Sequence, residues 1–418
     1  MDLSVIIVSY NVRYYLSVCL CSVQNAARGL KCEIFVVDNN SSDSSCEMVY
    51  KDFPEVKLIA NNDNRGFSAA NNQAIKIASG KYILLLNPDT IIGEDTFRKC
   101  IAFMDEHIDA GAAGVMMING SGKYLPESKR AIPDPETAFY KISGLSYLFS
   151  RSPRFNRYYM GHLDCREINY ADVIAGAFMF IRSEAVKKTG LLDESYFMYG
   201  EDIDYSYRLL KAGYKNYYFP EVKILHFKGE STKKEDMDFV INFYNAMLIF
   251  VKKHFNNGNL RKIILPVRIA ILFRAALSVT HRLFRKILVP FRKLKIVFRL
   301  KGTCDIPKSG MMVISDDRGY QRIKELLVPY GIKKDIHIRI NKDPDDEDDN
   351  ISKIITDIEE CIKNNRIRQV IFSPGQMKFS SVINCMHLLS HHRIRFRIAS
   401  PCERYLIGSG SVTAASVK

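Results

Sequence analysis

The chain has 418 residues, of which 47% are hydrophobic and 25% charged, and this is the composition of a globular protein with room for more than one domain. Its ten cysteines show no CxxC pair and no regular spacing, which argues against a zinc site and a disulfide framework and favours a reducing, cytoplasmic compartment. The formal net charge of +14 implies an anionic partner, such as a membrane surface, a nucleic acid or an acidic substrate.

No signal peptide and no membrane-spanning helix are predicted. Residues 3–8 are too short and too β-like for the apolar core of a signal peptide, and no basic stretch precedes them. The sequence also contains no run of about 18 uncharged apolar residues, which is the length that a membrane crossing requires.

Strands and helices are predicted to alternate over the first ninety residues. The apolar pattern predicts strands at 3–8, 33–38, 56–60 and 81–87, and helices at about 12–24 and 68–78. Alternation at this spacing is typical of a doubly wound, mostly parallel α/β sheet. The strands end in Tyr10, Asp38, Asn64 and Asp89, so we expect these side chains at one edge of the sheet, where open α/β sheets bind ligands.

The stretch from Lys81 to Thr90 is the centre of this pattern. Four successive apolar residues suit a strand that is covered on both faces, and Pro88 ends it because proline cannot donate to a sheet. Asp89 either caps the following helix or holds a divalent cation that binds a diphosphate, and this stretch alone favours neither interpretation. No GxGxxG or Walker motif is present, which argues against a dinucleotide cofactor and a P-loop nucleotide site.

The rest of the chain divides into less regular and more regular parts. Residues 91–170 are broken by prolines, strands are predicted at 172–182, 217–220 and 222–226, and helices at 184–189, from Glu201 to Ala212, and at 235–255. Residues 261–301 contain twelve Lys or Arg and no Asp or Glu. We therefore predict three parts: an N-terminal α/β domain (1–258), a basic apolar helical segment (259–302) and a small Rossmann-like α/β domain of unknown role (303–418).

The N-terminal part resembles the family 2 glycosyltransferases of the GT-A fold, in particular their bacterial rhamnosyltransferase-like branch. Five segments carry this resemblance, and they occur in the family's order: residues 4–11, 36–43, 64–72, 86–89 and 197–204. The resemblance implies a GT-A-type sheet and a set of donor-binding residues: Tyr10, Asn11, Asp38, Asn40, Asn64, Gly66, Asn72 and Asp89. Asp89 is then the metal-binding carboxylate of the DxD element, in which Asn87 replaces the first acid.

The resemblance also implies the catalytic and metal-binding residues. Asp202 is expected to act as the general base on the acceptor hydroxyl, with Glu201 beside it to orient the acceptor. In the absence of the resemblance, the helix dipole would explain both acids, because they lie in the first turn of a helix. Related enzymes place a metal- or diphosphate-binding histidine at the position of His226, so Asp89 and His226 are expected to hold Mg²⁺ or Mn²⁺.

These expectations describe a metal-dependent, inverting glycosyltransferase of cell-surface glycan synthesis. It would transfer a sugar from a nucleotide-diphosphate donor, with dTDP-rhamnose as one possibility, to a lipid-linked or polysaccharide acceptor. The basic segment fits an anionic membrane surface, so we expect a cytoplasmic protein, peripheral on the inner face of the membrane. The alternatives are a nucleotidyltransferase acting on sugar phosphates and a basic protein that binds nucleic acid or another anion. Clustering of the basic residues in one apolar-rich segment favours a membrane over nucleic acid.

Overall fold

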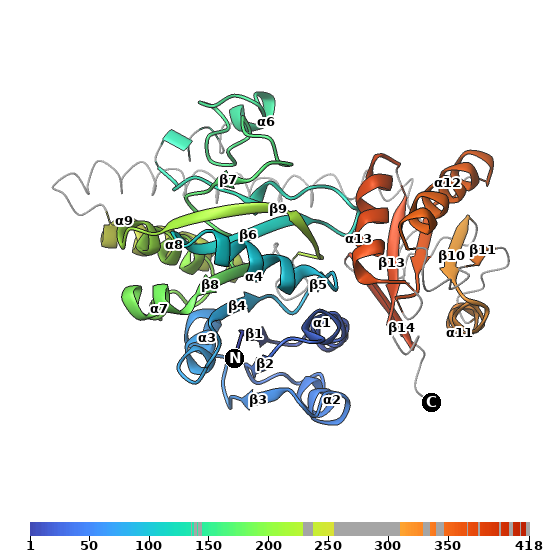
Figure 1. The fold of residues 1–418 in the computed structure, drawn as a ribbon, viewed down its shortest axis with the longest axis horizontal. Coiled ribbons are helices and arrows are strands. Elements are labelled where there is room, and N and C mark those ends of the chain that lie inside the picture. The colour runs from blue at the N-terminus through green and yellow to red at the C-terminus, as the bar shows by residue number, and fades with distance from the viewer. Residues whose placement is uncertain are drawn as a thin grey trace, which may run out of the picture.

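The computed structural model describes residues 1–134, 136–137, 140, 144–228, 237–254, 310–328, 335–339, 347–365, 367–374, 377–392, 394–400, 404–409 and 411–414. These residues form two β-sheets, and helices flank each of them (Figure 1). The basic segment predicted at 259–302 lies outside the described residues. Within the described residues, no helix has the combination of length and apolar character that crossing a membrane would require.

The larger sheet is built by the N-terminal part of the chain. Its strands are β1 (Leu3–Ser9), β2 (Cys32–Asp38), β3 (Lys57–Ala60), β4 (Tyr82–Leu86), β5 (Thr90–Ile92), β6 (Ala110–Ile118), β7 (Asn169–Tyr170), β8 (Phe178–Arg182) and β9 (Lys215–His226). The helices are α1 (Arg13–Ala27), α2 (Ser45–Asp52), α3 (Gly66–Ile75), α4 (Thr96–Glu106), α6 (Leu145–Leu148), α7 (Ser183–Thr189), α8 (Glu201–Lys211) and α9 (Met237–His254), with a 3₁₀ turn at Pro126–Ser128.

The strand order of this sheet is β3-β2-β1-β4-β8-β6-β9-β5, and β7 pairs with β9. β1 to β4, β6 and β9 run in one direction, whereas β5, β7 and β8 run in the other. Every residue of β1 and β4 is buried, as expected for strands that are covered on both faces. The mostly parallel α/β sheet predicted from the sequence is therefore confirmed.

Three details of the sequence-based prediction were wrong. Residues 91–170, which seemed irregular, contain β5, α4 and the fully buried strand β6. The strand predicted at 172–182 begins only at Phe178. The two short strands predicted on either side of Pro220 are a single strand, β9, whose pairing with β6 shifts register at this point. Proline lacks the N–H that a regular ladder needs, so the strand continues past it through a bulge.

The smaller sheet is built by the C-terminal part of the chain. Its order is β11-β10-β12-β13-β14-β15, and the last two strands form an antiparallel hairpin that the sequence did not reveal. The elements are β10 (Met311–Ser315), α11 (Asp317–Leu327), β11 (Asp335–Arg339), α12 (Glu347–Asn365), β12 (Gln369–Phe372), α13 (Phe379–Leu388), β13 (Arg395–Ala399), β14 (Tyr405–Gly408) and β15 (Ser411–Ala414), with a 3₁₀ turn at Leu389–His391.

The two units share a hydrophobic core, which the sequence did not predict. One cluster of buried side chains joins Ile91 of β5 and Leu225 of β9 with Phe379 and Ile383 of α13. Figure 1 shows α13 beside the ends of β5 and β9. The Tyr15 hydroxyl of α1 also donates to the carbonyl of Gly408 over 2.8 Å. The C-terminal unit is therefore packed onto β5, which begins directly after Asp89, and onto β9, which ends at His226.

Glu94 makes three of the polar contacts across this interface. Its carboxylate accepts hydrogen bonds from the backbone N–H of Phe379 (2.7 Å), and from the backbone N–H and hydroxyl of Ser380 (3.1 and 2.9 Å). The first N–H groups of a helix have no partner within the helix, and Lys378 at the N-cap position supplies no side-chain acceptor. A carboxylate from the N-terminal unit thus caps α13 of the C-terminal unit.

Glu94→Ala is expected to lower the free energy of unfolding by about 1–3 kcal/mol, because three donors to a carboxylate lose their acceptor. The measurement is urea unfolding of the full chain. Glu106→Ala, which removes an exposed glutamate at the end of α4, is the control and should change stability by less than about 0.5 kcal/mol. Equal effects of the two substitutions would show that the cap does not stabilise the interface.

Candidate active site

The ends of β1 and β2 form the first part of the site. The Asn39 N–H donates to the carbonyl of Ser9 over 2.9 Å, which fixes the two strand ends side by side. One carboxylate oxygen of Asp38 accepts the N–H of Ser41 at 2.7 Å. The other oxygen, Oδ1, is buried and has no hydrogen-bond partner among the described residues. A buried acceptor of this kind is costly unless a ligand satisfies it, so Asp38 is well suited to receive a donor such as a nucleobase N–H.

Tyr10, Asn11 and Asn40 lie in the loops that directly follow β1 and β2. The Tyr10 ring is 40% exposed, which leaves a face on which a base could stack. Asn11 and Asn40 both have positive φ angles, a conformation that asparagine tolerates better than most residues. The Asn11 side chain accepts the N–H of Ser42, and so it holds the loop that follows β2. All three residues are exposed, and of these Tyr10 alone has an aromatic ring on which a base could stack.

Gly66 is the tightest point of the next loop. Its φ is +78°, and a Cβ at this position would lie 2.4 Å from the carbonyl oxygen of Phe197. The neighbouring Phe67 N–H donates to the same oxygen over 2.7 Å, and Asn64 accepts the Gly66 N–H at 3.1 Å. Only glycine fits here without a shift of the backbone. The loop predicted to line the donor site is therefore fastened directly to the segment that leads into Glu201.

Asn72 of α3 also connects the loop of Gly66 to the segment that precedes Glu201. Its side chain is buried and bonds to both the N–H and the carbonyl of Leu192, and to the carboxylate of Glu194. These bonds use both the oxygen and the nitrogen of the side-chain amide. Asn72 is thus placed to position the site, and its direct contact with a donor stays a prediction.

Asp89 and His226 meet at the edge of the sheet. Thr90 pairs with His226 in the register of β5 and β9, and the Phe227 N–H donates to the carbonyl of Asp89 over 3.0 Å. His226 Nε2 lies 3.3 Å from Asp89 Oδ1, and both side chains are almost fully buried. His226 Nδ1 is also buried, with no hydrogen-bond partner among the described residues. An adjoining carboxylate and imidazole are a donor set that fits a divalent cation.

Asp202 lies in the first turn of α8, as predicted, but it is already paired. Arg130 Nη2 lies 2.5 Å from its Oδ2, which also accepts the Gly176 N–H at 3.2 Å, while Oδ1 accepts the Ile203 N–H at 2.8 Å. The side chains are 10% and 15% exposed, so the pair is largely buried. These bonds fix the direction in which the carboxylate points. The sequence analysis missed Arg130, since a single arginine in an irregular segment carries no signal.

Glu201 and Asp204 are in different environments on the same helix. Burial, reinforced by the nearby charge of Asp202, raises the pKa of Glu201 well above its ordinary 4.5. Asp204 has no exposed side-chain surface and pairs with Arg208, Lys253 and His254. Asp204 therefore joins α8 to α9, and it is enclosed too completely to meet a substrate.

The Asp89–His226 pair and the acidic residues at the start of α8 are connected through backbone N–H groups. The N–H of Asn87, in the turn before Asp89, donates to the carbonyl of Ala177 over 3.0 Å. The adjacent Gly176 donates its own N–H to Asp202, as described above. Two backbone hydrogen bonds thus connect the turn containing Asp89 to the carboxylate of Asp202. The arrangement places a potential metal site and a fixed carboxylate at one edge of the sheet.

Glu201→Gln is expected to change how stability depends on pH. A folded-state pKa above the unfolded value of 4.5 means that Glu201 costs increasing stability as the pH rises from 4.5 towards its folded pKa. Glutamine does not titrate, so the variant does not carry this cost. In this window its free energy of unfolding, measured with urea, should rise relative to that of the unmodified protein by up to about 1.4 kcal/mol per pH unit. A stability difference that is constant across the window would contradict a protonated Glu201.

Comparison with known proteins gives matches that each cover part of this chain. One relative is the N-acetylglucosaminyl-diphospho-decaprenol L-rhamnosyltransferase of Mycobacterium tuberculosis, which is 24% identical over 52% of this chain and 74% of its own length. Another is the low-salt glycan biosynthesis hexosyltransferase of Haloferax volcanii, which is 26% identical over 60% of this chain and 77% of its own length.

A similar solved structure is the mannosyltransferase PcManGT from Pyrobaculum calidifontis in complex with GDP-Man and Mn²⁺. It is 16% identical, with a TM-score of 0.41, over 71% of this chain and 83% of that structure. A family model also matches the part of the chain that contains Asp38 and Asp89. Residues 4–190 match the sequence pattern of Glycosyl transferase family 2.

Proposed function

We propose that this protein is an inverting, metal-dependent glycosyltransferase of cell-surface glycan synthesis, which transfers a sugar from a nucleotide-diphosphate donor to a hydroxyl of a lipid-linked or polysaccharide acceptor. One observation carries the proposal: the Asp89–His226 pair and the fixed Asp202 carboxylate lie at the same sheet edge, joined through Asn87 and Ala177. The match of residues 4–190 to Glycosyl transferase family 2 supports it.

The donor would lie across the ends of β1, β2 and β4. The nucleobase would stack on Tyr10 and satisfy the buried oxygen of Asp38. The diphosphate would then reach towards Asp89, which is at the end of the neighbouring strand β4. We place dTDP-rhamnose first among the donors, because the relative from Mycobacterium tuberculosis is named an L-rhamnosyltransferase.

Asp89 and His226 would hold Mg²⁺ or Mn²⁺ at this site. Bound there, the cation would neutralise the charge that develops on the departing nucleoside diphosphate. Both side chains are buried, and this supports the assignment. Attraction between a cation and its ligands is stronger where water is excluded.

Asp202 would remove the proton of the acceptor hydroxyl as its oxygen attacks the anomeric carbon. The bond to the nucleoside diphosphate breaks in the same displacement, and attack from the opposite face inverts the configuration. Arg130 and the Gly176 N–H would hold the carboxylate in its reactive direction. Glu201, with its raised pKa, would remain protonated at neutral pH and would donate a hydrogen bond that orients the acceptor.

Asp202→Asn is expected to keep donor binding and to lower the transfer rate about 10²–10⁴-fold, because an amide cannot accept the proton. The same substitution leaves Arg130 without its counter-charge, which can destabilise the fold. The double variant Arg130→Gln/Asp202→Asn keeps a neutral, hydrogen-bonded pair and separates these two effects.

Transfer rate and donor affinity are measured for Asp202→Asn, for the double variant, and for the single variants Arg130→Gln and Glu201→Gln. Arg130→Gln and Glu201→Gln should retain more activity than Asp202→Asn, because their role is to position other groups. Near-normal transfer in a folded Asp202→Asn protein would rule out Asp202 as the base. Transfer that is lost only in Glu201→Gln would assign the base to Glu201.

Asp89→Ala is expected to abolish measurable transfer and to weaken nucleoside diphosphate binding in Mn²⁺ by about tenfold or more, because the cation loses its carboxylate ligand. The affinity of the protein for the nucleoside diphosphate is measured by titration calorimetry, once in the presence of Mn²⁺ and once in the presence of a chelator. Asp52→Ala removes an exposed carboxylate at the end of α2 and should behave like the unmodified protein. If the unmodified protein binds the nucleoside diphosphate as strongly with the chelator as with Mn²⁺, the metal assignment is contradicted.

A further inference from the structure

An exposed apolar run covers the tip of the segment between β6 and β8. Three successive side chains, Tyr147, Leu148 and Phe149, are 87%, 73% and 50% exposed. No residue of the short helix α6 is buried, and Figure 1 shows α6 at the outer margin of the molecule, beyond the strands of the large sheet. Single exposed apolar residues are ordinary, but three in succession on a projecting tip indicate an interaction surface.

The charge around this run is positive. Residues 137–163 contain Lys141, Arg151, Arg154 and Arg157, and no Asp or Glu. Arg154 and Arg157 are largely exposed and pair at 3.4 and 3.5 Å with Glu136 and Asp134, so the segment 134–163 keeps a formal excess of two positive charges. We call Tyr147, Leu148, Phe149 and Arg151 the tip patch. Aromatic and aliphatic side chains flanked by arginine are typical of proteins that rest at a lipid–water interface.

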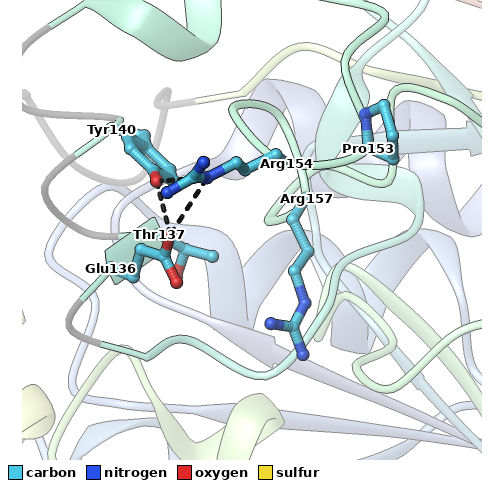
Figure 2. Close-up of a pocket in the computed structure, with 6 residues that line it drawn as sticks. All are labelled: Glu136, Thr137, Tyr140, Pro153, Arg154 and Arg157. Carbon is cyan, nitrogen blue, oxygen red and sulfur yellow. Dashed lines mark hydrogen bonds and ion pairs between the residues drawn. The ribbon is translucent and has the colours of Figure 1, made fainter.

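The tip patch stands on an ordered base. The Phe155 ring packs against Phe149 and Tyr140, with ring centroids 5.1 and 5.0 Å apart. Arg154 donates to the hydroxyl of Tyr140 over 3.0 Å and reaches towards Glu136, beside a cavity of about 320 Å³ (Figure 2). These contacts hold Phe149 in place while Tyr147 and Leu148 remain outside the packed rings.

The same segment connects the tip patch to the acceptor side of the proposed active site. The Ala131 N–H donates to the carbonyl of Tyr158 over 2.9 Å, and Lys129 donates to the carbonyls of Met160 and Leu163. Between Lys129 and Ala131 lies Arg130, which holds Asp202. The segment that carries the tip patch is thus attached on both sides of the residue that orients the proposed base.

We propose that the tip patch binds the surface of an anionic lipid bilayer, with Tyr147, Leu148 and Phe149 inserted among the headgroups and Arg151 against lipid phosphates. This inference rests on the proposed lipid-linked acceptor, whose head group lies at such a surface. Since the segment is attached at Lys129 and Ala131, on either side of Arg130, a membrane-bound tip patch would bring the acceptor hydroxyl towards Asp202. A bilayer is favoured over a protein partner because the patch projects from the fold and combines apolar side chains with positive charge.

The chain contains no tryptophan, so one introduced tryptophan is a background-free reporter. Tyr147→Trp in the full chain is mixed with vesicles of phosphatidylcholine and phosphatidylglycerol. Its emission should shift to shorter wavelength and be quenched by brominated lipid. The matched control is Tyr50→Trp on α2, since Tyr50 is 84% exposed, and it should show neither effect. Because residues 261–301 are present in both proteins, only contact at the tip patch can produce a difference.

Two further variants measure how much the tip patch contributes to vesicle affinity. Tyr147→Ser/Leu148→Ser/Phe149→Ser should lower vesicle binding about tenfold or more, and Arg151→Glu, an exposed change that leaves packing intact, should weaken binding to anionic vesicles more than to phosphatidylcholine alone. An unchanged Tyr147→Trp emission in vesicle-bound protein would overturn the proposal. A shift that appears without lipid as protein concentration rises would also overturn it, and would assign the patch to a second copy. Neither measurement uses donor or acceptor, so failure here is distinct from failure of the transferase assignment.

Discussion

The pairing of β5 with the end of β9 is the contact on which the proposed site depends most. It sets Thr90 opposite His226 and thereby brings the imidazole to 3.3 Å from Asp89. A strand of three residues has little stability of its own, so this geometry requires support from its surroundings. The support is the shared cluster in which Ile91 and Leu225 pack with α13, and the Asp89–His226 contact therefore depends on residues from the far end of the chain.

This dependence gives the C-terminal unit a structural role. Helix N-termini in α/β folds are natural anion sites, because their first N–H groups point outward without partners. At α13 that position is taken by the carboxylate of Glu94 from the N-terminal unit. Together with the apolar contacts of Phe379 and Ile383, it makes the unit a brace for β5 and β9. A ligand-binding role for this helix end would first have to displace Glu94.

Arg130 connects Asp202 to the irregular segment between β6 and β7. Its guanidinium fixes Asp202, while its neighbours Lys129 and Ala131 anchor the irregular segment that ends in the tip patch. A buried ion pair is weak evidence for stability, because its desolvation cost offsets most of the attraction. Retention of a buried arginine at this position is better explained by orientation of the carboxylate and by connection of the two regions.

The sequence by itself determined the buried strands β1, β2 and β4, because their long apolar runs leave few alternatives, and it located Asp38 and Asp89, because parallel strands end at a common edge. It also located the acids of α8 from the resemblance of residues 197–204. Only the tertiary structure decided which side chains meet. The Arg130–Asp202 pair, the fit of Gly66 beneath Phe197, and the contact of α13 with β5 each join residues that are distant in the chain. Hydrophobic periodicity reports the faces of single elements, whereas partners across elements are set by register and packing, which no local pattern encodes.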